Sequence, residues 1–307
     1  MPRRTDMVID ELLTNIAMSV ENKGFVADRI FPSVPVVRSE DYYAVYGKEN
    51  FNYVDAELKR DAGFPVTHRS MSRSQYSLKE FGLAEFLFYK EIDEARTQGI
   101  DVRADTAVSL MQKMMLVREA QVQGALTTSA SFTNKVELSG TDQWSHPSSD
   151  PIANVLTANL AIRESAGVAP NFMLVSYPVY RALLQNPVIE ARLGANQTKK
   201  VTPEALSTLF EIDNIIVAEA QYNSVKSPGT SDIGNWVWGK NAFIGYSAPS
   251  PARKQVSLGY RFNRGDVQIL DWDAPADRRG KYVGIYVNEV NHLTEEKCGY
   301  PIFDAIA

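Results

Sequence analysis

The sequence predicts a mixed α+β fold, on the strength of three observations. Residues 101–127 have the apolar spacing of one long helix, and residues 150–220 alternate between helix and strand patterns. Further along the chain, QVSLGYRF and KYVGIYVNEV have the residue types of strands. Helices that alternate with strands indicate an α/β or α+β core built on a mixed sheet.

The composition is that of an ordinary globular protein and argues against several classes. With 307 residues, the chain is long enough for one elaborate domain or two ordinary ones. The formal net charge of −5 argues against extensive nucleic-acid binding, which needs a basic surface. Cys298 is the single cysteine, so an internal disulfide is excluded. We expect neither a signal peptide, because the start is charged, nor a membrane span, because long apolar runs are absent.

Residues 1–40 are expected to form an arm. The apolar residues between Ile9 and Ala17 recur at helical spacing, and Gly24 is a plausible stop. The apolar segment Phe25 to Val37 follows, in which Pro32 and Pro35 prevent a continuing helix. This segment is unsuited to a central strand, so we expect it to lie on its own subunit or on a neighbour.

Residues 42–80 are expected to form a long two-stranded excursion. Aromatic residues at strand spacing are followed by turn residues at 47–50, and the returning segment is polar and alternating. A hairpin with so little apolar surface cannot build its own core. We therefore expect it to pack on something else, for which a neighbouring subunit is a candidate.

Residues 101–127 give the clearest helix pattern. Asp101 is placed to cap the helix, and Asp105 adds a favourable negative charge in the first turn. Such a helix is roughly 40 Å long and suits a spine for other elements. The expected apolar stripe consists of Ala104, Val108, Met111, Met115, Val122 and Leu126.

The next helix is expected to run from Asp150-Pro151, an N-cap followed by proline, to a stop at Gly167. Beyond it we expect a strand at Phe172 to Val175, helices opening at Ser176 and Thr202, and a strand at Asn214 to Ala220. The segment NWVWGKNAFIGY is expected to form a hairpin with its turn at Gly239 to Asn241. The expected buried face of the first helix comprises Ile152, Val155, Leu156 and Leu160.

The chemistry-bearing residues do not form a recognisable active site. His68, His146 and His292 lack metal-ligand spacing from a second histidine or cysteine. The run from Asp142 to Asp150 contains a serine, a histidine and carboxylates, but real catalytic triads converge from distant segments. We interpret this run as a polar loop that ends in a capping aspartate. We expect no catalytic, cofactor-binding or metal-binding residues.

Three stretches together resemble the major capsid proteins of tailed bacteriophages, which share the Hong Kong 97-type capsid fold. The first is NKGFVADRIFPSVPVV with the YYAVYGKENF that follows it. The second is DPIANVLTANLAIRESAGVAPNFMLVSYPVYRALLQNPVI, and the third is VTPEALSTLFEIDNIIVAEAQYN with VWGKNAFIGY. Their order and spacing match across nearly the whole chain.

The resemblance implies a phage major capsid fold in four parts. These are an N-terminal arm at 1–40, an extended β-hairpin loop at 41–80, a peripheral domain with a long spine helix at 81–149 and 261–307, and an axial α/β domain at 150–260. It implies a non-enzymatic subunit that self-assembles into pentamers and hexamers of an icosahedral shell around double-stranded phage DNA. The expected location is the virion, after assembly in the host bacterial cytoplasm.

The resemblance also implies partners and contacts. We expect the chain to bind itself, a portal and possibly decoration proteins, and to enclose DNA without specific binding. The arm pattern starts close to Met1, so a separate scaffold protein is expected in place of a cleaved segment. Lys48 and Lys59 lie where some members cross-link, but a reacting partner is not evident. The subunit-contact candidates are Phe25, Ile30, Phe31, Val34, Tyr42, Tyr43, Tyr46 and Phe51.

Two alternatives remain open at this point. An encapsulin-like nanocompartment shell has the same fold but encloses protein, and the nucleic-acid content of particles distinguishes the two. A soluble hydrolase that uses the Asp142–Asp150 cluster is the second alternative. A monomer with measurable turnover would favour the hydrolase.

Overall fold

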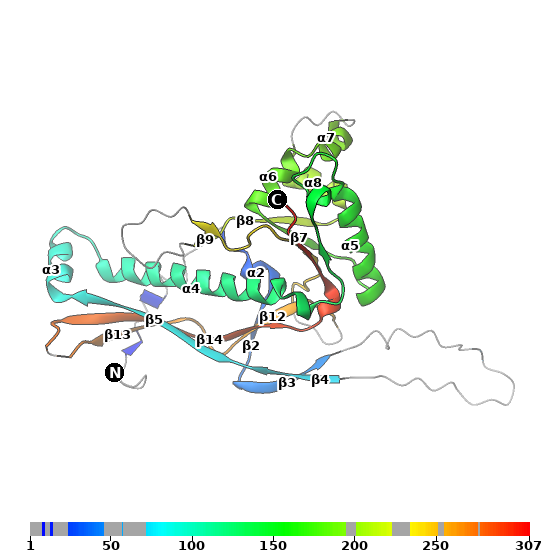
Figure 1. The fold of residues 1–307 in the computed structure, drawn as a ribbon. Coiled ribbons are helices and arrows are strands. Elements are labelled where there is room, and N and C mark those ends of the chain that lie inside the picture. The colour runs from blue at the N-terminus through cyan, green and yellow to red at the C-terminus, as the bar shows by residue number, and fades with distance from the viewer. Residues whose placement is uncertain are drawn as a thin grey trace.

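The fold is elongated and built on two sheets joined by one long helix (Figure 1). In the computed structural model, one end carries strands that run beside the helix, and the other end carries a second sheet with helices packed on it. The structure describes residues 8–9, 13–14, 24–45, 57, 72–194, 201–222, 234–250, 255–275 and 277–307.

The first sheet has six strands, with β14 at its centre. The order is β1-β13-β14-β12-β2, and β5 pairs with the other side of β14. All pairs are antiparallel except that of β2 with β12. The strands are β1 (Val8–Ile9), β2 (Ser33–Pro35), β5 (Lys79–Phe88), β12 (Gly259–Asn263), β13 (Gln268–Asp273) and β14 (Gly280–Leu293).

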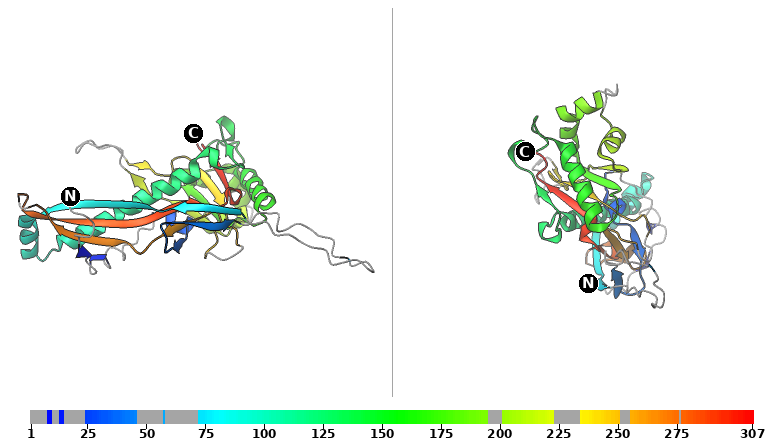
Figure 2. Two further views of the ribbon diagram at one scale, coloured as in Figure 1. Left: turned by 90° about the horizontal axis from the view of Figure 1, so that it is seen from below. Right: turned by 90° about the vertical axis from the view of Figure 1, so that its right-hand side faces the viewer.

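The long helix α4 (Val102–Thr127) lies along this sheet and confirms the predicted spine. Its 26 residues give a length of about 39 Å. Asp101 caps it by accepting hydrogen bonds from the backbone N–H groups of Arg103 and Ala104. Figure 2 shows β5, β13 and β14 running beside the helix. Between helix and sheet lie Leu110, Met111 and Met114 of α4 with Ile269, Val283, Ile285 and Val287 of the strands.

The second sheet has five strands in the order β6-β15-β11-β7-β8, and it is mixed, as the sequence predicts. β7 and β8 are parallel, as are β15 and β6, whereas β11 is antiparallel to both of its neighbours. The strands are β6 (Val136–Glu137), β7 (Phe172–Ser176), β8 (Asn214–Ala218), β11 (Ala242–Gly245) and β15 (Gly299–Phe303). The helices near it are α5 (Pro151–Ala166), α6 (Tyr177–Leu184), α7 (Pro187–Gly194) and α8 (Pro203–Phe210).

Helix α5 starts and stops where the sequence predicts, but it buries a different face. Asp150 accepts from the N–H groups of Ile152 and Ala153, and Gly167 ends the helix with φ of 73°. Leu156 and Leu160, expected inside, are 39% and 56% exposed. The buried face instead follows Ile152, Val155, Ala158, Asn159, Ile162 and Ala166. The small alanine side chains on this face let the helix approach its neighbours closely, so the larger leucines lie outside.

The expected hairpin over 235–246 is wrong in its pairing. Its turn exists, with Gly239 at φ 56°, but β10 (Asn235–Trp236) pairs with β9 (Gln221–Tyr222). β11 lies between β7 and β15 instead. The turn carries the chain from one sheet to another, because two neighbouring strands in a buried sheet satisfy both sides of β11.

The sheets divide the chain differently from the expected boundaries. β6 and β15 lie in the five-stranded sheet, although 81–149 and 261–307 were assigned to the peripheral part. The sequence patterns also did not predict β5, β13, β15 or the helix α3 (Tyr89–Thr97). Ile9, expected in a helix, lies in β1, while Leu13 and Thr14 are helical. The rest of that predicted helix lies outside the described residues.

Candidate assembly surface

The base of the extended hairpin is formed by β3 (Glu40–Val45) and β4 (Ser72–Ser77), as predicted. The two strands are antiparallel, with Glu40 opposite Ser77 and Val45 opposite Ser72. After Leu78 the chain continues directly into β5, so the hairpin is joined to the six-stranded sheet. Apart from residue 57, positions 46–71 lie outside the described residues, and with them the expected contact residues Tyr46 and Phe51 and the lysines Lys48 and Lys59.

An aromatic cluster fixes this base to its own chain. The Tyr76 ring stacks on Phe262 of β12, with centroids 4.5 Å apart and planes 19° from parallel. The Tyr43 hydroxyl hydrogen-bonds Nε2 of His292 in β14 at 2.9 Å. Burial raises the pKa of Tyr43 and lowers that of His292, so both side chains favour their neutral forms. The base of the hairpin therefore packs on its own subunit.

The arm segment forms one turn of helix, α2 (Ala27–Ile30), and then the edge strand β2. Ile30 and Phe31 are fully buried in the core of the same chain, and a side chain at Gly259 would collide with the Phe31 ring. Phe25 packs partly buried against that core. Ile30 and Phe31 are thus internal residues and offer no surface to a neighbour, which corrects the expectation for these two.

Other candidate contact residues lie nearer the surface. β2 is the last strand of its sheet, which suits Pro35 because an edge strand tolerates a missing N–H. Val34 is partly buried against the aromatic cluster at the hairpin base. Tyr42 is 64% exposed and Val37 is also strongly exposed, beside the same hairpin. These exposed side chains form the described part of the candidate assembly surface.

Arg118 of α4 holds the arm to the sheet through buried ion pairs. Its Nε and Nη2 both donate to the Glu289 carboxylate at 2.9 Å, and its Nη1 donates to Asp28 of α2 at 3.2 Å. Arg261 of β12 also pairs with Asp28. Burial lowers the pKa of Arg118, but its bonds to Glu289 and Asp28 outweigh this and raise it overall. Burial and the nearby Arg118 charge lower the pKa of Arg261.

Glu119, the next residue of the helix, binds the start of α2. One carboxylate oxygen accepts from the N–H groups of Val26 and Ala27, at 3.0 and 2.9 Å. The other accepts from the Trp238 indole N–H at 2.5 Å. Burial raises the pKa of Glu119, although all three donors favour the charged form. The sequence analysis missed this junction, for which the only signal was an adjacent Arg–Glu pair within an otherwise apolar helix.

The polar run from Asp142 to Asp150 does not assemble a catalytic triad. Asp150 caps α5, and Ser145 Oγ accepts from the backbone N–H of Ala307 at 3.0 Å. His146 Nδ1 contacts Ser148, in the same turn. These groups serve turns and a helix cap, in agreement with the interpretation as a polar loop.

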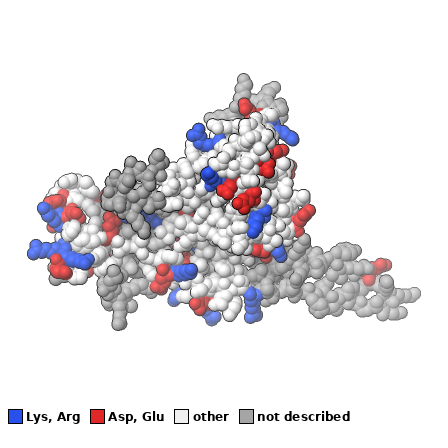
Figure 3. Space-filling view, in the orientation of Figure 1, with Lys and Arg blue, Asp and Glu red and all other residues white. Residues whose placement is uncertain are grey.

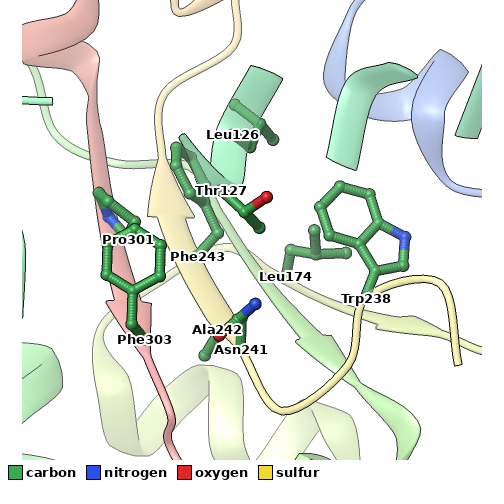
Figure 4. Close-up of a pocket in the computed structure, with 9 residues that line it drawn as sticks. All are labelled: Leu126, Thr127, Leu174, Trp238, Asn241, Ala242, Phe243, Pro301 and Phe303. Atoms are coloured by element: carbon green, nitrogen blue, oxygen red, sulfur yellow. The ribbon is translucent and has the colours of Figure 1, made fainter. Parts of the chain in front are cut away.

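The cavities are poorly suited to a substrate. The apolar one in Figure 4, beneath Phe243 and Trp238, has a volume of about 10 Å³, which is scarcely room for one water molecule. A larger depression of about 220 Å³ lies over the Arg118–Glu289 pair. Burial raises the pKa of Cys298 to about 12, so its thiol is unreactive at neutral pH.

The described part of the chain contains neither a group of three or more His, Cys, Asp or Glu residues placed to hold a metal nor a helix long and apolar enough to cross a membrane.

Comparison with known proteins identifies the relatives. The chain is 27% identical over 272 residues to the major capsid protein of Burkholderia phage BcepMu, covering 86% of each chain. It is 28% identical to the major capsid protein of Pseudomonas phage JBD67, covering 84% of each. The chain is a homologue of tailed-phage major capsid proteins. No protein-family model matches it.

Solved structures show that this homologue has the phage major capsid fold. A phage-related protein from Bordetella bronchiseptica RB50 superposes with a TM-score of 0.78 at 24% identity, over 97% of this chain and 98% of that one. The capsid of cyanophage P-SCSP1u gives 0.58 at 10% identity, over 93% and 89%. A virus-like particle from Pyrococcus furiosus gives 0.60 at 13%, over 95% and 98%.

Proposed function

We propose that this chain is the major capsid protein of a tailed bacteriophage, a shell subunit without enzymatic activity. The observation that carries the proposal is sequence similarity to two phage major capsid proteins along 84–86% of this chain and of theirs. The phage capsid fold, shared along nearly the whole chain, supports it further.

In the proposed shell, identical subunits form pentamers and hexamers that tile an icosahedron. Tyr42, with the adjoining Val34 and the hairpin residues Tyr46 and Phe51, supplies contacts between subunits. An exposed tyrosine suits such a role, because it buries a large ring at low cost in side-chain entropy. Tyr43 contributes indirectly, because its bond to His292 sets the direction of the hairpin.

The subunit encloses double-stranded DNA without gripping it. The net charge of −5 gives phosphate little to bind, so weak and salt-sensitive contact is expected. A separate scaffold protein, a portal and decoration proteins complete the proposed assembly, which takes place in the host bacterial cytoplasm and ends in the virion.

The encapsulin-like alternative has one observation in its favour, the fold shared with the Pyrococcus furiosus particle. That likeness is at 13% identity and concerns the fold alone, whereas the relatives found by sequence are phage capsid proteins. The hydrolase alternative draws no support from the contacts of Asp150, Ser145 and His146, which serve a cap and turns.

Electron microscopy and mass measurement of particles test the proposal. The chain expressed in bacteria, with the neighbouring phage genes supplied, should form closed shells, and particles from phage-producing cells should contain double-stranded DNA. Shells that contain only protein cargo would favour the nanocompartment. A soluble monomer at micromolar concentration, under every salt and scaffold condition, would contradict both shell functions.

A further inference from the structure

One face of the six-stranded sheet carries a row of aromatic rings at the end remote from the five-stranded sheet. Side chains alternate along β14, so Val283 faces α4 and its neighbour Tyr282 faces the opposite side. Tyr282 is directly opposite Phe86 of β5 and Trp272 of β13. Residues paired in this way lie on one face of a sheet, so the three rings cross three strands on the face away from α4.

The rings pack on one another and on the bare backbone. Trp272 stacks on Tyr282 at 5.4 Å, Tyr282 meets Phe86 at 5.1 Å, and Phe86 meets Phe88 at 4.8 Å. A side chain added at Gly284 would collide with the Trp272 ring. The four rings, here called the aromatic row, therefore lie low against the strands and form a preformed surface.

The aromatic row is exposed. Phe88 is 51% exposed, and the other three rings are half-buried. Among the described residues, the hydrophobic core clusters include none of the four. A contiguous set of exposed aromatic side chains marks a binding surface more often than scattered apolar residues do.

The rim of the row is polar and carries both signs of charge. The Arg278 guanidinium donates to the Tyr282 hydroxyl at 2.8 Å, and Lys281 lies 3.5 Å from Asp273. Figure 3 shows basic and acidic side chains intermixed at this end of the molecule. Aromatic rings within a polar rim that contains arginine are the usual anatomy of a protein–protein contact. A rim with both signs is able to pair with a copy of itself.

We propose that the aromatic row binds the same end of a second copy of this chain. This inference rests on the proposed shell function and names one of its contacts. The mixed rim favours a second copy, because a partner of one dominant charge would be repelled by half of it. The row lies at one end of an elongated subunit, so such a contact joins subunits end to end.

The test measures how much protein is needed for shells to form, by light scattering and electron microscopy. Phe88→Ser removes the most exposed ring, and Phe88→Tyr keeps it. We expect the serine variant to fold with an unchanged melting temperature but to need on the order of tenfold more protein for assembly, as for the loss of a central interface ring. Tyr222→Ser, at a similarly exposed aromatic residue on β9, is the matched control and should assemble like the parent.

A second variant keeps the test decisive if Phe88→Ser does not fold. Arg278→Glu, on an exposed loop, should weaken assembly several-fold, and more at low salt because exposed charges are screened. Normal assembly of a folded Phe88→Ser or Arg278→Glu variant, or an equal defect in Tyr222→Ser, would overturn the contact while leaving the shell function intact. Failure of the parent chain to form particles would overturn the shell function itself.

Discussion

The two sheets differ in how completely the chain covers them. Every residue of β7 and β11 in the five-stranded sheet is buried, whereas β5 in the six-stranded sheet has buried or partly buried side chains alternating with exposed ones. The first sheet is a finished core, while the second is packed on one face by α4 and left open on the other. Stability and assembly are therefore carried by different parts of the molecule.

Matched phenylalanine deletions give the largest expected contrast. Phe243 is buried between Phe132 and Phe172, so Phe243→Ala should lower the free energy of unfolding by about 3–5 kcal/mol. Phe86→Ala, on the open face, should cost about 1–2 kcal/mol, because half of that ring already meets water. Urea unfolding measures both. Equal losses would mean that the two sheets do not differ in this way.

Arg118→Met tests the junction between arm and sheet. It leaves Glu289 buried without its two strongest donors, so we expect a loss of about 3 kcal/mol in urea unfolding. The double variant Arg118→Met with Glu289→Met should be less damaging than the single one, since no unpaired charge is left. A double variant worse than the sum of the singles would indicate that the pair stabilises beyond its packing.

Glu119→Gln tests the same junction through pH. The amide loses the bond from Trp238, which should cost roughly 1–3 kcal/mol. Burial raises the pKa of Glu119 above the ordinary value of 4.5, so its contribution is fully present below that value and is lost as the pH rises through the folded pKa. The advantage of the parent over the glutamine variant, from urea unfolding across a pH series, should therefore shrink as pH rises. An advantage that grows with pH would show that the three donors dominate over burial.

The smallest expected effect concerns the cap of α5. Asp150→Ala removes the acceptor for Ile152 and Ala153 and should cost about 1 kcal/mol in thermal unfolding. Asp142→Ala, at an exposed carboxylate in the same polar run, should change stability by less than about 0.5 kcal/mol. If Asp142→Ala is the more damaging variant, the run has a role other than capping.

Local signals in the sequence predicted the elements that depend on neighbouring residues. Asp101, Asp150 and Gly167 mark helix ends correctly, because a cap is made within a few residues of itself. The long helix and the base of the hairpin were likewise confirmed. Pairing across the chain was less predictable, because the pattern of β11 does not specify whether β10 or β7 is its partner.

The candidate site divides in the same way. Exposed Tyr42 fits its prediction as a contact residue, which stays a prediction, whereas Ile30 and Phe31 are internal. An apolar side chain reads the same whether its own subunit or a neighbour covers it. Arg118 and Glu119 were missed because their partners, Glu289 and Val26, lie far from them along the chain.

The position of β15 has a consequence for the order in which the protein can fold. This strand comes after every other described strand in the sequence, yet it lies inside the five-stranded sheet, between β6 and β11. On the ribosome, the sheet therefore lacks an interior strand until residues beyond 303 have emerged. A nascent chain with that sheet still open is not yet a complete building block, so the fold delays assembly until synthesis has passed this point.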